Sequence, residues 1–161
     1  MAKTANIPSS PAIRMLQQHQ AAFELQPYAY EDHGGTAVAA RELGVDEHQV
    51  IKTLVMEDEN HQPLLILMHG DQEVSTKALA REINVKSITP CQPAAATRHT
   101  GYQVGGISPF GTRKALPVYM EESIVRLPYI YINGGRRGLL VKILPADLIN
   151  LLKPIAVQAA R

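Results

Sequence analysis

The segment Gly101–Gly111, with the sequence GYQVGGISPFG, constrains the fold of this chain more than any other. It places four glycines and one proline between two apolar segments. Glycine lets another chain or a ligand approach the backbone, and proline makes Ser108-Pro109 extended or turning. Adjacent glycines also leave peptide N–H groups free to converge on an anionic oxygen. The segment therefore predicts a tight loop, either empty or built around a ligand.

A second glycine-rich segment, residues 133–138, follows another apolar strand and reads NGGRRG. Basic pairs accompany both segments, Arg113-Lys114 in the first case and Arg136-Arg137 in the second. Two such loops favour the rim of one site. The alternative for the basic pairs is an ordinary solvated surface.

Length and charge limit the possible classes of protein. The 161 residues fit one domain, residues 1–161, and we expect residues 1–9 to form a flexible N-terminal tail. A formal net charge of +1 gives no global attraction to nucleic acid, so any such binding must come from local clusters. The start does not resemble a signal peptide, and no apolar run approaches the roughly 20 residues that span a bilayer. We expect a cytoplasmic protein.

Cysteine and histidine usage argues against metal and disulfide chemistry. The single cysteine, Cys91, excludes an internal disulfide and cysteine-rich zinc sites, and it has no evident activating partner. The six histidines include no His-x-x-x-His pair, so we expect no metal site.

Hydrophobic patterning predicts alternating helices and strands. Ser9 or Ser10 and Pro11 begin a helix, Thr36 caps another, and the unbroken apolar run Leu64–His69 is typical of a central strand. The expected helices are 11–23, 37–43, 75–83, 89–97 and 145–152, and the expected strands are 23–30, 50–56, 64–69, 85–88, 117–120, 129–132 and 139–144. The connections mix hairpins with helices. The chain therefore predicts an α/β (α+β) fold, a mixed sheet curled into a barrel-like core with flanking helices.

Several nucleotide and nucleophile motifs are missing from the sequence. It has no P-loop and no Gly-x-Ser-x-Gly elbow, and Ser108, followed by proline, is expected to be structural.

Lys52 shares a strand face with Val50 and Leu54. It therefore lies either at a solvent-exposed end or edge of the strand, or buried and paired. The remaining candidate groups are thus an amine, glycine backbone donors and basic pairs. Such groups can hold and polarise an ester or phosphodiester, but they are poor nucleophiles. The nucleophile would come from water or the substrate.

Three blocks of sequence resemble the YbaK/ProX family of aminoacyl-tRNA deacylases, which is related to the editing domain of prolyl-tRNA synthetases. The blocks are Val50–Leu54, Thr100–Gly111 and Tyr131–Leu139. The resemblance implies a cofactor-free enzyme that removes cysteine from Cys-tRNA(Pro) and Cys-tRNA(Cys). It also implies substrate-assisted chemistry, in which the cysteine thiol attacks its own ester and leaves as a thiolactone. The implied partners are the acceptor end of aminoacyl-tRNA and, as a candidate, prolyl-tRNA synthetase.

The same resemblance implies roles for individual residues. Lys52 matches an essential lysine that orients the terminal adenosine or the aminoacyl group, Gly105 and Gly106 match the backbone near the ester, and these three form the expected catalytic set. The expected substrate-binding residues are Tyr30, Thr53, Ile107, Ser108, Asn133, Gly134 and Gly135. The expected tRNA contacts are Arg113, Lys114, Arg136 and Arg137.

The chain departs from the family pattern at the expected pocket. Gly34, Gly35 or Thr36 stands where relatives place an aromatic residue, Leu140 where aspartate is common, and Asn133 where serine is common. Pocket shape sets amino-acid preference, so alanine and serine remain alternative substrates. A non-catalytic module that binds tRNA or a synthetase remains a further alternative.

Overall fold

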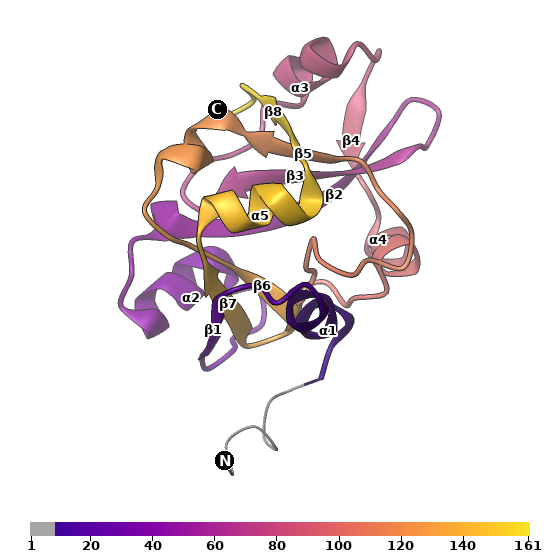
Figure 1. The fold of residues 1–161 in the computed structure, drawn as a ribbon. Coiled ribbons are helices and arrows are strands. Elements are labelled where there is room, and N and C mark those ends of the chain that lie inside the picture. The colour runs from indigo at the N-terminus through magenta and orange to yellow at the C-terminus, as the bar shows by residue number, and fades with distance from the viewer. Residues whose placement is uncertain (1–8) are drawn as a thin grey trace, which may run out of the picture.

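The computed structural model describes residues 9–161, so the expected N-terminal tail lies outside the described residues except for Ser9. Within this range the chain folds into one eight-stranded mixed sheet with five α-helices (Figure 1). The strands are β1 (Phe23–Pro27), β2 (Val50–Asp58), β3 (Pro63–His69), β4 (Ile88–Pro90), β5 (Val118–Glu121), β6 (Ile130–Arg136), β7 (Leu139–Ile143) and β8 (Ile155–Val157). The helices are α1 (Pro11–Gln18), α2 (Gly35–Leu43), α3 (Thr76–Ile83), α4 (Pro93–Thr100) and α5 (Pro145–Leu152), with short 3₁₀ helices η2 (Glu47–Gln49) and η3 (Glu122–Arg126).

The sheet has the strand order β1-β7-β6-β2-β3-β5-β8, with β4 paired to β2. Parallel pairs (β2/β6, β3/β5 and β5/β8) are mixed with antiparallel pairs (β1/β7, β6/β7, β2/β3 and β2/β4). This arrangement confirms the predicted mixed α/β class with flanking helices. The strand path is open, so the barrel-like curl does not become a closed barrel within residues 9–161. Pro27 lacks a backbone donor and β8 is only three residues long, which limits further pairing at both edges.

The core lies on both faces of the central strand β3. Residues Leu64–His69 are all buried, as the unbroken apolar run predicted. Alternate residues face opposite sides: Ile66 and Met68 pack in one cluster with Leu79 of α3, whereas Leu67 packs in the large cluster with Ile132. A layered core of this kind holds β2, and therefore Lys52, in the middle of the sheet.

Some ends of helices and strands were predicted correctly from neighbouring residues, and others were not. The Ser10 hydroxyl accepts the Ile13 N–H at 3.1 Å and caps α1, as predicted. Thr36 does not cap α2, because the cap position is Gly34 and the Thr36 hydroxyl lies 2.8 Å from Glu47 Oε2. The strand expected at 85–88 lies at Ile88–Pro90 instead, where it pairs with β2. The sequence analysis missed β8, a three-residue strand that exists through pairing with the distant β5.

The glycine-rich segment Gly101–Gly111 forms an irregular loop held by buried polar contacts. The Tyr102 hydroxyl donates a 2.6 Å hydrogen bond to the Phe110 carbonyl, and burial raises the pKa of Tyr102 to about 12, so it stays a neutral donor. Ser108 is fully buried, and its hydroxyl oxygen accepts the Phe110 N–H at 3.2 Å. At the far end Gly111 touches α1, where a Cβ would lie 2.6 Å from the Pro11 carbonyl oxygen. Tyr102 and residues 108–110 of the loop are therefore packed in the core, whereas residues 103–105 are exposed.

Removing the Tyr102 hydroxyl tests this anchoring. Tyr102→Phe leaves the buried Phe110 carbonyl without its donor, so we expect the free energy of unfolding to fall by about 1–3 kcal/mol. Urea unfolding followed by circular dichroism measures the change. Tyr129→Phe is the matched control, because that side chain is 45% exposed. Equal losses in the two variants would contradict the anchoring role.

Candidate functional site

A cavity of about 680 Å³ opens where the two glycine-rich loops meet the middle of the sheet. This volume lies within the range of small-ligand sites. Its wall is made by residues of β2, α2, α4, β6, β7, the Gly101–Gly111 loop and the connection after β1. Seven of the predicted catalytic, substrate-binding and tRNA-binding residues line it: Tyr30, Lys52, Thr53, Gly105, Ile107, Asn133 and Arg137.

Lys52 supplies a positive charge to this wall. On one side of β2, Lys52 pairs with Met68 of β3. On the other side β6 pairs only with Val50 and Ile51, and β4 pairs only from Met56 onward, so among the described residues no strand pairs with β2 beside Lys52. Its side chain is half-buried, and Nζ makes one long hydrogen bond of 3.4 Å to the Gly70 carbonyl. No carboxylate of residues 9–161 pairs with it. An ammonium carries three donors, so two remain for a ligand.

The two glycine-rich loops lie directly against each other. A Cβ on Gly106 would lie 2.8 Å from the Arg137 nitrogen and 2.9 Å from the Arg136 carbonyl carbon, so no side chain fits there. Asn133 ties the loops together: Nδ2 donates to the Gly105 carbonyl at 3.3 Å, and Oδ1 accepts the Gly135 N–H at 2.6 Å. The loops thus form one continuous rim.

The structure separates the two glycines whose backbone was expected to approach the ester. The Gly106 N–H is used within its own turn, where it donates to the Gln103 carbonyl at 2.8 Å. Gly105 and Ile107 both line the cavity, and in the described part of the chain neither N–H has a protein acceptor. Gly106 therefore serves close packing, whereas Gly105 and Ile107 are the candidates for polarising a ligand oxygen.

Tyr30 and Arg137 form the mouth of the cavity. The Arg137 guanidinium lies over the Tyr30 ring, 5.4 Å from its centre, and Nε donates to the Val104 carbonyl at 3.0 Å. A Cβ on Gly105, whose φ is +94°, would lie 2.5 Å from the Tyr30 hydroxyl. The glycine is thus required both for its backbone angle and for the space that Tyr30 occupies.

The inner end of the cavity is apolar. Leu140, only 4% exposed, belongs to one buried cluster with Ala39 and Val50, and all three line the wall. Thr53 belongs to the wall as well, and its Oγ1 is buried without a hydrogen-bond partner among the described residues. Cys91 also lines the wall. Burial, with Glu57 nearby, raises the pKa of its thiol to about 11, which makes it a poor nucleophile at neutral pH.

Seven other predicted site residues lie outside the cavity wall: Gly106, Ser108, Arg113, Lys114, Gly134, Gly135 and Arg136. Ser108 is fully buried in its loop, and a Cβ on Gly134 would face Val141, Ile13 and Leu139 in the core. Gly135 packs on Tyr102, because a Cβ there would lie 2.9 Å from its ring. These three residues shape the loops instead of reaching a ligand in the cavity. Arg113, Lys114 and Arg136 are exposed around it.

The sequence analysis missed the contribution of Gly70. No role was predicted for Gly70, yet its carbonyl is the acceptor that Lys52 touches. A glycine directly after a central strand was the available signal, but no local pattern links it to a lysine 18 positions away.

Residues 9–161 contain no group of three or more side chains that could hold a metal ion, and none of their helices is long and apolar enough to cross a membrane.

Known proteins resemble this chain over nearly its whole length. Residues 31–151 match the family model described as "Aminoacyl-tRNA editing domain". The protein named "Putative Cys-tRNA(Pro)/Cys-tRNA(Cys) deacylase EbsC", from Enterococcus faecalis, is 30% identical over 152 residues, which cover 94% of this chain and 93% of that protein. A proline–tRNA ligase of Thermodesulfovibrio yellowstonii is 36% identical over 69 residues, 43% of this chain and 12% of the ligase.

A solved structure described as "a putative trans-editing enzyme for prolyl tRNA synthetase" superposes with a TM-score of 0.82, covering 96% of this chain and 99% of that one. At 22% identity this likeness concerns the fold alone. The family model, together with the relative from Enterococcus faecalis, confirms the resemblance inferred from the sequence blocks around Lys52 and the two glycine-rich loops. The chain belongs to the aminoacyl-tRNA editing domain family.

Proposed function

We propose that this protein is a trans-editing deacylase that removes cysteine from Cys-tRNA(Pro) and Cys-tRNA(Cys). The observation that carries the proposal is an ammonium, Lys52 Nζ, without a carboxylate partner among residues 9–161, in the same cavity as the open backbone donors of Gly105 and Ile107. The name of the relative from Enterococcus faecalis supports this choice of substrates, and the matching prolyl-tRNA ligases support prolyl-tRNA synthetase as a partner. Its place of action would be the cytoplasm, where aminoacyl-tRNA is used.

The cavity suits an ester that supplies its own nucleophile. Lys52 would hold the acceptor end or offset the negative charge that develops on the ester oxygen, and the Gly105 and Ile107 N–H groups would polarise the carbonyl. The cysteine sulfur would bond to its own carbonyl carbon as the ester C–O bond breaks. The thiol proton would end on the ribose hydroxyl, and the amino acid would leave as a thiolactone. Cys91, with its raised pKa, takes no part.

The apolar inner wall favours a small side chain. Leu140, Ala39 and Val50 offer no hydrogen bond to a serine hydroxyl, whereas a thiol or a methyl group is compatible with apolar contacts. Alanine is therefore the second candidate substrate, and the rate comparison below separates it from cysteine.

Replacing Lys52 with an uncharged residue of similar shape tests the role of the ammonium. Lys52→Met is expected to lower kcat/KM for release of cysteine by about 100-fold or more, because a charge that stabilises the transition state is lost. Lys77→Met on α3 is the control, because Lys77 is exposed and lies outside the cavity wall. Full activity of Lys52→Met would overturn the proposal. Binding without turnover in the unaltered protein would favour the non-catalytic module.

Replacing the thiol of the substrate tests whether that thiol or a water molecule is the nucleophile. 2-Aminobutyryl-tRNA(Pro) has a methyl group in place of the thiol, so self-cyclisation is impossible. We expect its release to be at least about 100-fold slower than that of cysteine, as for removal of any essential nucleophile. Alanyl-tRNA(Pro) and seryl-tRNA(Pro) complete the panel. Comparable rates for cysteine and 2-aminobutyrate would show that water attacks, and a faster release of alanine would change the assigned substrate.

The exposed basic residues are expected to contact phosphates of the tRNA. Arg136→Gln should reduce the slope of log K against log[salt] by about 0.7–0.9 if it removes one phosphate contact. Filter binding with uncharged tRNA at several salt concentrations measures this slope. Arg161→Gln is the control, because Arg161 is also exposed but pairs with Glu73. An unchanged slope for Arg136→Gln would make Arg136 an ordinary solvated residue.

A further inference from the structure

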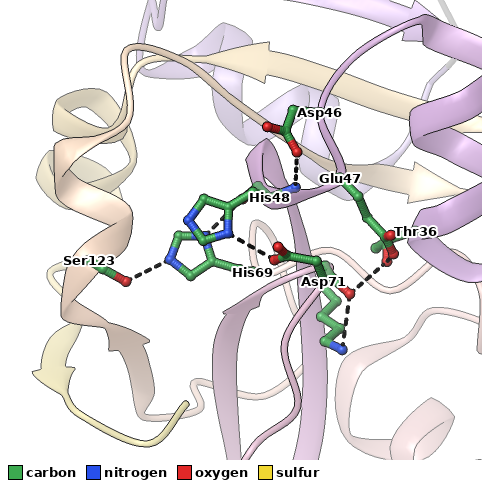
Figure 2. Close-up of polar contacts among 9 residues, drawn as sticks. Thr36, Asp46, Glu47, His48, His69, Asp71 and Ser123 are labelled. Atoms are coloured by element: carbon green, nitrogen blue, oxygen red, sulfur yellow. Dashed lines mark hydrogen bonds and ion pairs between the residues drawn. The ribbon is translucent and has the colours of Figure 1, made fainter. Parts of the chain in front are cut away.

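Four polar side chains meet around the turn that follows β3: His48, His69, Asp71 and Ser123, here called the histidine clamp (Figure 2). His69 is fully buried, with Nδ1 2.8 Å from the His48 carbonyl oxygen and Nε2 2.7 Å from Ser123 Oγ. A carbonyl only accepts, so Nδ1 carries the proton and Nε2 accepts the Ser123 hydroxyl. Both nitrogens of a neutral ring are thus engaged, and burial lowers the pKa of His69, which keeps the ring neutral.

His48 fixes the other side of the turn. Its ring stacks on that of His69, with centroids 3.7 Å apart and planes 4° from parallel. Its Nδ1 lies 2.9 Å from Asp71 Oδ1, and its backbone N–H donates to Asp46 Oδ1 at 3.0 Å. Figure 2 shows the stacked rings with Ser123 on one side and Asp71 on the other. His48 of η2 and Ser123 of η3 therefore hold His69 and Asp71, the residues immediately before and after Gly70.

Gly70 is itself closely surrounded. Its N–H donates to the Val50 carbonyl at 2.7 Å, and a Cβ there would lie 2.7 Å from that oxygen and from Thr36 Oγ1. Its carbonyl accepts from Lys52 Nζ at 3.4 Å and lies 3.2 Å from Thr36 Oγ1. Among the described residues this carbonyl is the sole hydrogen-bond partner of Lys52 Nζ. Any shift of Gly70 therefore changes what orients the ammonium.

A catalytic serine–histidine pair is not what these contacts describe. In such a pair the remaining ring nitrogen faces a carboxylate and the serine faces a substrate. Here His69 Nδ1 donates to a backbone carbonyl, and neither His69 nor Ser123 belongs to the cavity wall. The arrangement is one that fixes a backbone position.

We propose that the histidine clamp holds the Gly70 carbonyl in place and thereby orients the Lys52 ammonium toward the cavity. His48, His69 and Asp71 are then positioning residues for the deacylation, so the kinetic part of this inference rests on the proposed function. The part that concerns Lys52 itself does not.

The kinetic test removes the more exposed member of the clamp. Asp71→Ala releases His48, and we expect kcat to fall about tenfold with KM within about twofold, since misorientation of a catalytic group affects the transition state most. Asp71→Asn keeps an acceptor for His48 Nδ1 and should restore most of the activity. Glu73→Ala, two positions later in an exposed ion pair, is the matched control. Equal kinetics for Asp71→Ala and Glu73→Ala would overturn the positioning role.

A second readout needs no activity. In protein labelled with ¹³C at the lysine Cε, the Lys52 signal is assigned by its loss in Lys52→Met. Asp71→Ala should shift this signal and leave that of the exposed Lys77 unchanged, whereas Asp71→Asn and Glu73→Ala should leave both in place. An unmoved Lys52 signal in folded Asp71→Ala would overturn the inference. A shifted signal in a protein that releases no amino acid would sustain it while the proposed function fails.

Discussion

The close approach of two glycine-rich loops is the contact on which the site depends. Gly106 lies against the backbone of Arg136 and Arg137, at a distance that excludes any side chain. Asn133 then links the loops through hydrogen bonds to Gly105 and Gly135. The contact joins the Gly101–Gly111 loop to the β6–β7 turn, and the cavity exists because β2 runs beside both. Buried anchors such as the Tyr102–Phe110 hydrogen bond keep the first loop in its place.

The half-buried Lys52 amine has no carboxylate partner among residues 9–161, and burying such a group lowers the stability of the fold. Its position in the cavity wall suggests a function for it. Partial burial of an ammonium loses hydration that one 3.4 Å hydrogen bond to Gly70 does not replace. If only the free energy of folding mattered, a paired or apolar side chain would be preferred at position 52 of β2. Under the proposed function, the ester of an aminoacyl-tRNA would supply the partner that Lys52 Nζ lacks among residues 9–161. The histidine clamp places a second buried polar group near Lys52. Its fully buried imidazole, that of His69, is hydrogen-bonded at both ring nitrogens.

Local patterns in the sequence were enough for most elements of the fold. The apolar run of β3 predicted its burial, and the Ser10 and Ser75 caps follow from short-range hydrogen bonds. Predictions failed where a distant partner decides the structure. The strand β8 forms only against β5, and the hydroxyl of Thr36 turns away from its helix toward Glu47. The mixed sheet with flanking helices was predicted, and its strand path within residues 9–161 is open.

The sequence by itself determined the family and the mixed α/β class, because glycine spacing and strand patterns are encoded over short stretches. It also predicted roles for Lys52 and the glycine-rich loops. The tertiary structure alone decided which groups face the cavity. It placed Ser108 and Gly134 in the packing, used the Gly106 N–H within its own turn, and left the Gly105 and Ile107 N–H groups without a protein acceptor among residues 9–161. It also brought Lys52 to the Gly70 carbonyl, next to the histidine clamp. Those assignments depend on contacts between residues far apart in the chain, and a side chain's direction in such contacts is fixed only when the whole sheet is assembled.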